Sequence, residues 1–325
     1  MGLQMRMWLL LVIMFGILYG IVVGVGTWMG AGGAILYLIL AIVFMGFQFL
    51  IGPSMVSKMM GVKWVSEKEE PELHRTVKEL AERAGIPKPK VGISRLSVPN
   101  AFAFGRSQKS GRICITQGIQ RLLSKDELKA VLGHEIAHLK HRDMIIITVL
   151  SVIPLICYWI AFSMMWRGML GGRREGGGNY TILIGIGAML LYFITNLIIL
   201  YGSRIREYYA DAGSVRIGNP PHHLATALYK LVYSSAQLQR NPQVKEELKR
   251  VEGVKAFFVN DISRAYHEIG DLKEVDRDLS GTIDQNELME LRQKTIKLGR
   301  SAKMMEILTT HPNMLKRIKH LSTLT

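Results

Sequence analysis

Three long stretches of this chain carry no charged side chain, and they constrain its fold more than any other feature. Asp, Glu, Lys and Arg are absent from residues 8–57, 144–166 and 176–203. A helix that crosses a bilayer needs about 20 predominantly apolar residues, so each stretch is long enough for at least one span. Buried core segments of a soluble protein rarely produce three such blocks, so the sequence predicts a membrane protein.

The apolar stretches divide the chain into four predicted parts. The first stretch is too long for a signal peptide and is interrupted by glycines at residues 30–33, which predicts an uncleaved helical hairpin. The predicted order is a transmembrane hairpin over residues 1–57 (spans at about 8–29 and 34–56), a soluble part over 58–143, a second hairpin over 144–202 (spans at about 144–165 and 181–202) and a helical soluble part over 203–325.

Charges beside the spans set the expected topology and partners. Arg6 precedes the first span, and Lys58 and Lys63 follow the second, so the positive-inside rule places both ends of this hairpin in the cytoplasm. The turn of the second hairpin, at residues 167–179, would then lie outside, but this loop is rich in Arg and the positive-inside rule disfavours that location. A net charge of +15 is compatible with nucleic acid, but the chain has no zinc-finger, helix-turn-helix or RNA-recognition signature. We therefore expect the lipid bilayer as a partner and no nucleic acid.

The first soluble part has the pattern of a small α+β domain. Apolar residues at helical spacing follow Pro71, and short strand-like runs occupy residues 90–93, 100–104 and 112–116. The sequence Ser124-Lys125-Asp126-Glu127 forms a capping box before a helix predicted over 128–140. The expected fold is mainly α, with four transmembrane helices and a small sheet beside this last helix.

The helix predicted over residues 128–140 carries the sequence His134-Glu135-Ile136-Ala137-His138. Positions four apart lie on one face of a helix, so His134 and His138 can reach the same metal ion, as zinc requires. Glu135 lies next to that ion, where a carboxylate can take a proton from a water that zinc acidifies. The other interpretation of the motif is a surface helix with two unpaired histidines.

A catalytic zinc needs a third protein ligand, and the sequence offers two candidates. His141 lies seven residues beyond His134, which is about 10 Å along the helix axis and too far to share one ion. Glu207 and Asp211 share a helix face directly after the fourth predicted span. Taken alone this pair is typical of a solvated surface, but opposite a two-histidine motif it can supply a ligand and a carboxylate that orients one.

These motifs resemble the M48 family of membrane zinc endopeptidases. In that family two histidines of HExxH and a glutamate of ExxxD hold zinc, which implies His134, His138 and Glu207 as ligands. The resemblance further implies Glu135 as the general base and Asp211 as the supporting carboxylate, with one Zn²⁺ per chain.

Two further segments carry the resemblance. Asn100-Ala101-Phe102 matches the Asn-Ala-Phe strand that precedes the zinc helix, and His311-Pro312 matches a C-terminal His-Pro segment. Arg317 follows His311 by six residues, as the family pattern requires, while Asn313 replaces the second proline of His-Pro-Pro. A strand edge near the metal can bind an extended peptide, so Asn100, His311 and Arg317 are candidates for binding the substrate backbone or the transition state. Otherwise the strand is ordinary core sheet and His311 a helix cap.

The resemblance also implies a biological setting. It implies a cytoplasmic catalytic domain in the plasma membrane of a prokaryote, acting on misfolded or unassembled membrane proteins. Two alternatives are a processing protease of the CAAX type, whose family members are longer, and a zinc-stabilised membrane adaptor without catalysis. The oligomeric state is left open by the sequence.

A second metal motif lies outside the family pattern. Residues 276–287 fit the loop of an EF-hand, with Gly281 at the sharp turn. Oxygen ligands for calcium would come from Asp276, Asp278, Ser280, Thr282, Asp284 and Glu287. Helices are expected over 262–274 and 286–298. EF-hands usually occur in pairs, and the alternative interpretation is an acidic surface turn that binds no ion.

Overall fold

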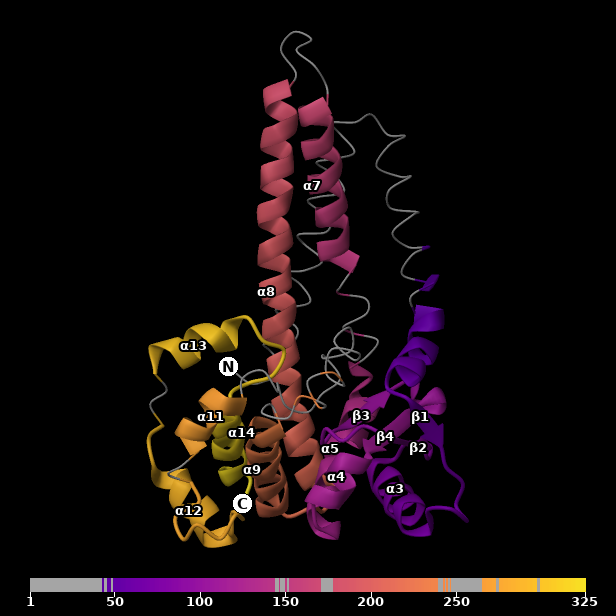
Figure 1. Cartoon of the computed structure of the whole chain (residues 1–325), viewed down its shortest axis with the longest axis vertical. Helices are drawn as coiled ribbons and strands as arrows, with labels where there is room; N and C mark the ends of the chain where they lie inside the picture. The colour runs from indigo at the N-terminus through magenta and orange to yellow at the C-terminus, as the bar shows by residue number, and fades with distance from the viewer. Residues whose placement is uncertain are drawn as a thin grey trace. The chain divides into compact units, whose positions relative to one another are not determined.

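The computed structural model describes residues 52–143, 152–170, 178–238, 265–272, 275–296 and 299–325, with isolated positions in 43–51, 144–151 and 241–246. The chain divides into two compact units. The helical unit comprises residues 1–51 and 145–203, and the α+β unit comprises residues 52–144 and 204–325. The elements of each unit are shown in Figure 1.

The described elements confirm a mainly helical fold with a small sheet. In chain order they are β1 (Val62–Trp64), α3 (Pro71–Ala84), β2 (Lys90–Ser94), β3 (Ala101–Phe104), the 3-10 helix η1 (Gln108–Ser110), β4 (Arg112–Thr116), α4 (Gln117–Leu122), α5 (Lys125–His141), α7 (Val152–Leu170), α8 (Gly178–Arg216), α9 (Pro221–Leu238), α11 (Ala265–Leu272), α12 (Gln285–Gln293), α13 (Arg300–Ile307) and α14 (Met314–Ser322).

The four strands form one mixed sheet in the order β1-β2-β4-β3. Strand β2 is parallel to β4, while β1 and β3 are antiparallel to their neighbours. Strand β3 therefore lies at an edge of the sheet, with Ala101 opposite Ile115 and Phe104 opposite Arg112. The three strands predicted from the sequence are present. Strand β1 was not predicted, because its three residues are too few for an alternating pattern.

Capping residues in the sequence account for the ends of helices α3 and α5. Helix α3 has Pro71 in its first turn and ends at Gly85, which adopts a left-handed conformation with φ 70°. Helix α5 begins at the predicted capping box, in which Ser124 and Glu127 exchange side-chain-to-backbone hydrogen bonds. Its C-terminal cap is Arg142, a non-glycine residue with φ 57°. The chain consequently turns back sharply after the last turn of α5.

Close approach of α5 and α8 depends on two glycines. A Cβ atom built on Gly213 of α8 would lie 2.5 Å from the Cβ of Ala137 on α5. A Cβ atom on Gly133 of α5 would lie 2.7 Å from the hydroxyl of Ser214, which donates a hydrogen bond to the Ala130 carbonyl. The side chains of Ala137, Ser214 and Asn219 occupy the space that each Cβ would need, so the two glycines let α5 and α8 approach closely, and these helices carry the candidate metal ligands.

Apolar side chains bury the other side of α5. Helix α9 packs against α5, α11 and α14, and α12 packs against α14. The main core combines residues of α3, the sheet, α5, α9 and the C-terminal helices. Helix α12 ends at Gln293, earlier than the expected residue 298, because the Lys319 ammonium donates to the carbonyls of Leu291, Arg292 and Lys294. Helix α11 covers Ala265–Leu272 of the helix expected over 262–274.

Among the described residues of the helical unit, α7 and the first part of α8 are apolar. Residues 182–216 form the one helix among the described residues that is long and apolar enough to cross a membrane, and residues 153–165 form a shorter apolar helix. Helix α8 does not stop at the predicted span end, residue 202, but continues to Arg216. Glu207 and Asp211 thus belong to the same helix as the predicted fourth span. The spans predicted at 8–29 and 34–56 lie largely outside the described residues.

Replacing Gly213 by alanine tests the close helix contact. The Gly213→Ala variant must separate α5 from α8, so we expect a loss of about 1–3 kcal/mol of folding stability and weaker metal binding. Gly270→Ala is the matched control, because nothing lies within 4 Å of a Cβ atom built at this helical position. We expect Gly270→Ala to be neutral or to stabilise by up to about 1 kcal/mol. Thermal unfolding and zinc titration measure both effects; equal behaviour of the two variants would contradict the packing argument.

Candidate metal centre

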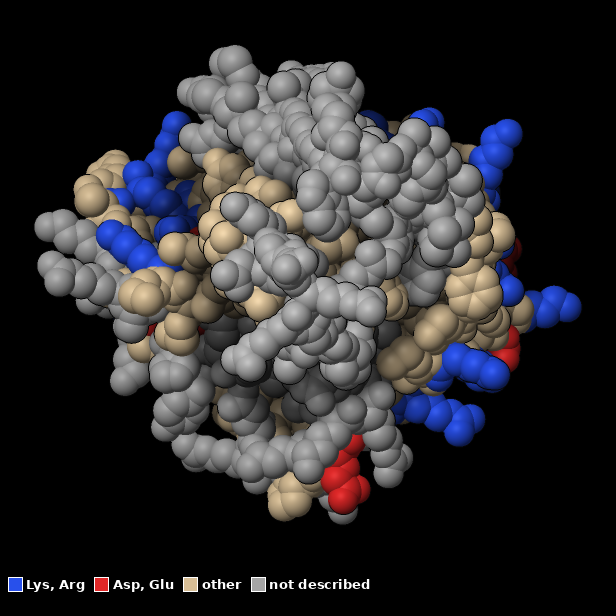
Figure 2. Space-filling view, turned by 90° about the horizontal axis from the view of Figure 1, so that it is seen from above, with Lys and Arg blue, Asp and Glu red and all other residues tan. Residues whose placement is uncertain are grey.

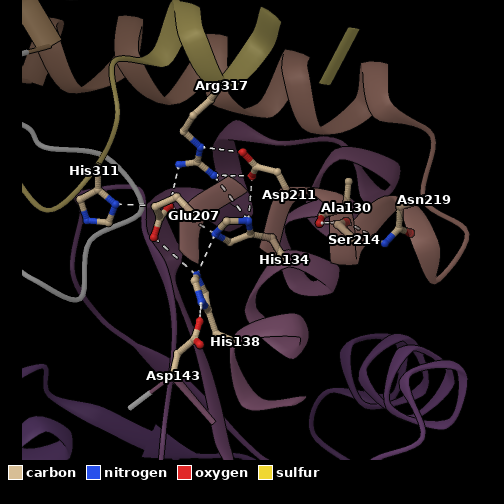
Figure 3. Close-up of polar contacts among 10 residues, drawn as sticks. All are labelled: Ala130, His134, His138, Asp143, Glu207, Asp211, Ser214, Asn219, His311 and Arg317. Carbon is tan, nitrogen blue, oxygen red and sulfur yellow. Dashed lines mark hydrogen bonds and ion pairs between the residues drawn. The ribbon is translucent and has the colours of Figure 1, made fainter. Parts of the chain in front are cut away.

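Helices α5 and α8 bring together the three predicted metal ligands. The Nε2 atoms of His134 and His138 are 3.1 Å apart and face each other. Each of these atoms is also 3.6 Å from a carboxylate oxygen of Glu207. The three side chains form a group whose donor atoms all lie within 4.8 Å of one another. Figure 3 shows the two imidazoles converging on the Glu207 carboxylate.

The other nitrogen of each imidazole is held by an aspartate. The Nδ1 atom of His134 lies 2.9 Å from Asp211 Oδ1, and the Nδ1 atom of His138 lies 2.6 Å from Asp143 Oδ2. A carboxylate accepts a hydrogen bond, so these contacts assign the imidazole proton to Nδ1 in both rings. The two Nε2 atoms face each other and the carboxylate of Glu207 (Figure 3).

The charges around this cluster fit a divalent cation. The buried ionisable groups are Glu135, Asp143, Arg206, Glu207, Asp211 and Arg317. With His134 and His138 neutral, as metal ligands must be, and with His311 acting on Glu207 as a positive charge, four carboxylates against three positive groups leave one uncompensated negative charge in a buried site. The two Nε2 atoms beside the carboxylate can be bridged by a proton or by a metal ion, and two His and one Glu is a donor set found at catalytic metal sites. The residues present therefore fit a metal ion.

The surroundings of His134 also favour a proton on its imidazole. Burial lowers the pKa of this imidazole, but hydrogen bonding to Asp211 and Glu207 outweighs burial and raises the pKa to about 9. A metal ion and a proton thus compete for the same nitrogen, and metal binding must release that proton.

The two carboxylates of α8 are held ionised by cationic neighbours. Burial alone would raise the pKa of Glu207, but His311 and Arg317 overcome it and hold the pKa well below 4.5. For Asp211 burial likewise raises the pKa, and the charge of Arg317 together with the contact with His134 lowers it below 3.8. The Arg317 guanidinium lies 3.0 Å from Glu207 Oε2 and 2.6 Å from Asp211 Oδ1. Both carboxylates are consequently negative and available as ligand and support.

Glu135 lies in the same buried cluster. Burial raises the pKa of its carboxyl group, and the nearby imidazoles of His138 and His134 partly oppose this rise. A backbone hydrogen bond from Ala103 in β3 also acts on this carboxylate. A carboxylate with a raised pKa is better matched to accepting and returning a proton near neutral pH.

The remaining predicted residues occupy different positions around the cluster. His311 Nδ1 lies 3.3 Å from Glu207 Oε2, and Arg317 is fully buried between Glu207 and Asp211. Asn100 is also buried, and its backbone N–H donates to the Thr116 hydroxyl at the start of β3. His141 does not belong to the metal-binding group; its ring lies against Tyr209, with centroids 6.0 Å apart.

Asp143 was missed by the sequence analysis. It lies five residues after His138, immediately before a charge-free block, where a charge is easily assigned to the membrane boundary. Its position just past the end of the predicted helix could have revealed it, because a carboxylate there can fold back onto the last turn.

The acidic loop brings three of its carboxylates together. Asp276, Asp278 and Glu287 each offer an oxygen within 4.8 Å of the others. Gly281 has φ 78°, as the turn in a calcium loop requires. The Asp284 side chain instead accepts from the backbone N–H of Glu287 as the N-cap of α12.

The arrangement of the site is characteristic of one class of protein. Two histidines one helical turn apart, a glutamate from a second helix and an acidic residue beside the metal position are typical of metallopeptidases. Residues 67–325 match peptidase family M48. The chain belongs to this family of metalloproteases, which confirms the resemblance found in the sequence.

Individual relatives agree with this assignment. A protein named Protease HtpX homolog from Methanothermobacter thermautotrophicus is 50% identical over 238 residues, covering 73% of this chain and 89% of the relative. A protein of the same name from Aeropyrum pernix is 33% identical over 317 residues, covering 94% and 93%. The crystal structure of S. mikatae Ste24p has a similar fold, with a TM-score of 0.54 at 17% identity, covering 98% of this chain and 65% of that longer one.

Two variants separate the candidate third ligands. Glu207→Gln keeps the size of the side chain but removes its charge, so we expect zinc affinity to fall at least about tenfold. His141→Ala should leave zinc affinity unchanged, because its ring lies outside the donor group. Zinc stoichiometry and chelator competition measure both. Loss of zinc from the His141 variant with retention in the Glu207 variant would show that the ligand is assigned wrongly.

Proposed function

We propose that this chain is a zinc-dependent membrane endopeptidase in which His134, His138 and Glu207 hold the metal. The observation that carries the proposal is the convergence of two imidazole Nε2 atoms and one carboxylate in a buried site with excess negative charge. Zinc is the usual ion for two imidazoles and one carboxylate, since it accepts nitrogen and oxygen ligands in tetrahedral geometry.

Each residue of the cluster has a separate proposed task. When bound, zinc supplies Lewis acidity to the scissile carbonyl and to water. Glu135 accepts a proton from the attacking water and returns it to the leaving amine, which its buried position and raised pKa support. Asp211 holds His134 in the Nδ1–H tautomer.

The structure favours different roles for His311 and Arg317. Because Arg317 is fully buried and bonded to two carboxylates, we assign it to positioning Glu207 and Asp211 and not to direct substrate contact. His311 stays a candidate for binding the transition state, because its imidazole lies beside Glu207 at the edge of the donor group.

Strand β3 is the proposed site of substrate binding. In an antiparallel pair, successive residues of a strand direct their backbone N–H and C=O groups to opposite edges. The carbonyl of Asn100 accepts a hydrogen bond from the backbone N–H of Thr116, at the end of β4. The backbone groups of Ala101 and Ala103 therefore point to the opposite edge, the one on which Glu135 lies. An extended peptide pairing with this edge would present a carbonyl to the metal position, with Asn100 at the start of the strand as a further backbone-binding residue.

We propose the membrane context from the apolar helices and the charge distribution. Helix α8 supports one span, and four spans with a cytoplasmic catalytic domain follow from the sequence pattern. Among the described residues in the view of Figure 2, Lys and Arg side chains outnumber those of Asp and Glu, in line with the net charge of +15, and a basic surface suits anionic lipid. We propose misfolded or unassembled membrane proteins of a prokaryotic plasma membrane as substrates, as the family resemblance implies; the names of the relatives support a protease.

Two other functions make different predictions. A CAAX-type processing protease would cut prenylated peptides at one defined position, whereas a quality-control protease cuts unfolded chains at many positions. A non-catalytic adaptor would need the metal for folding but would not need Glu135. The buried position of Glu135 within the metal cluster favours catalysis over the adaptor.

Replacing the proposed base tests catalysis directly. Glu135→Gln should keep bound zinc and reduce casein cleavage by about a hundredfold or more, because the amide cannot accept a proton. Zinc content and cleavage rate are measured on the same purified sample. Full activity of a zinc-loaded Glu135→Gln protein would rule out the mechanism.

We further propose that the loop 276–287 binds calcium in a structural role. The converging carboxylates support this, as do the hydrogen bonds between Thr226 of α9 and the backbone of Ile283, which join the loop to the core. An ion in the loop would thereby stiffen the packing of α9 against α5.

Calcium should raise the melting temperature of the zinc-loaded protein. At about a hundred times its dissociation constant the ion would add about 2.7 kcal/mol of stability. The double variant Asp278→Asn and Glu287→Gln should lose this calcium-dependent rise, measured against its own melting temperature in chelator. Identical melting curves of the native protein in calcium, magnesium and chelator would leave the loop as an acidic turn.

A further inference from the structure

Each imidazole of the metal cluster contacts an aspartate that is paired with a guanidinium, and Figure 3 shows the two aspartates, Asp211 and Asp143. Asp211 contacts His134 and is bonded to Arg317. Asp143 contacts His138 and is bonded to Arg206, but only the Asp211 pair is part of the family motif found in the sequence. The repeated arrangement indicates that the second pair performs for His138 the task that the first performs for His134.

The geometry at His138 is that of a fixed hydrogen bond. The distance from its Nδ1 to Asp143 Oδ2 is 2.6 Å, which is short for a nitrogen–oxygen hydrogen bond and consistent with a charged acceptor. Asp143 is 3% exposed and Arg206 is 8% exposed, so water does not compete effectively for either group. The Arg206 guanidinium donates to the backbone carbonyl of Asp143 at 3.1 Å, and its Nε lies 3.6 Å from Asp143 Oδ2. Arg206 thus holds the backbone of Asp143 by a hydrogen bond and lies beside its carboxylate as an ion-pair partner, with no hydrogen bond from Nε.

The backbone path explains how Asp143 reaches the last turn of α5. Arg142 adopts φ 57°, an uncommon conformation for a residue with a side chain, and its N–H bonds back to His138 and Leu139. This reversal places Asp143 beside His138 instead of continuing the helix axis. Asp143 precedes the point where the chain enters the helical unit, and Arg206 follows the point where it returns. Their pairing joins the two ends of that inserted segment at the metal cluster.

We propose that Asp143, held by Arg206, is a positioning residue that fixes His138 in the Nδ1–H tautomer and aims its Nε2 at the metal. This inference rests on the proposed zinc site. An ion pair that only stabilises the fold would lower the melting temperature when broken, but it would not change the tautomer or the metal affinity beyond that. The two interpretations therefore differ in metal binding and not only in stability.

The test uses the full-length protein in detergent, with zinc affinity measured by chelator competition. Asp143→Asn keeps the shape but removes the charge, and its amide can donate to Nδ1 and force the proton onto Nε2. We expect a 10–100-fold loss of zinc affinity and an altered visible spectrum of the cobalt-substituted protein. Asp126→Asn, an exposed change at the start of α5, is the matched control and should retain native affinity and spectrum.

Arg206→Gln tests the second half of the pair. It should weaken zinc binding less than Asp143→Asn, because it acts one contact further from the metal. If the two residues act as a unit, the double variant should bind zinc no more weakly than Asp143→Asn alone. Additive losses would show that Arg206 does not act through Asp143.

A measurement on the unmutated protein keeps the inference separate from the zinc assignment. Nitrogen NMR of zinc-free, ¹⁵N-histidine-labelled protein at mildly alkaline pH should show His138 protonated at Nδ1, with the signal assigned from a His138→Gln sample. An Nε2–H tautomer, or native zinc affinity in Asp143→Asn, would overturn the proposal. If the His134→Ala and His138→Ala variants bind zinc as the native protein does, the proposed zinc site fails instead, and the tautomer measurement still decides the role of Asp143.

Discussion

The facing lone pairs of His134 and His138 are the constraint on which the rest of this structure depends. Their Nε2 atoms lie 3.1 Å apart in a buried site, an arrangement that needs either a proton shared by the two rings or a metal ion between them. The surrounding groups are consistent with that requirement. Arg317 and Arg206 compensate part of the carboxylate charge and leave an excess that suits a divalent ion.

The scaffold maintains this geometry by direct backbone packing. Gly133 and Gly213 allow α5 and α8 to approach until side-chain atoms of one helix would collide with any Cβ atom on the other. A ligand displaced by about 1 Å can abolish function, so rigid helices are better carriers of metal ligands than loops. Helix α8 continues from the apolar stretch to the metal cluster without interruption, so Glu207 and the predicted fourth span belong to one continuous helix.

The sequence predicted local features of this site better than long-range ones. The capping box at Ser124, the sheet strands and the His134–His138 spacing depend on neighbouring residues, and each is present in the structure. Asp143 and the burial of Arg317 depend on contacts between distant segments, which periodicity does not encode. The end of α12 was predicted too late for the same reason, because the Lys319 ammonium that terminates it comes from α14.

X-ray absorption at the zinc edge of the purified, zinc-loaded protein tests the central claim most directly. We expect a spectrum with two imidazole ligands and otherwise only oxygen ligands, and the loss of one imidazole contribution in His138→Ala. A spectrum with sulfur ligands, or with fewer than two imidazoles in the native protein, would contradict the assignment of His134, His138 and Glu207 as the metal centre.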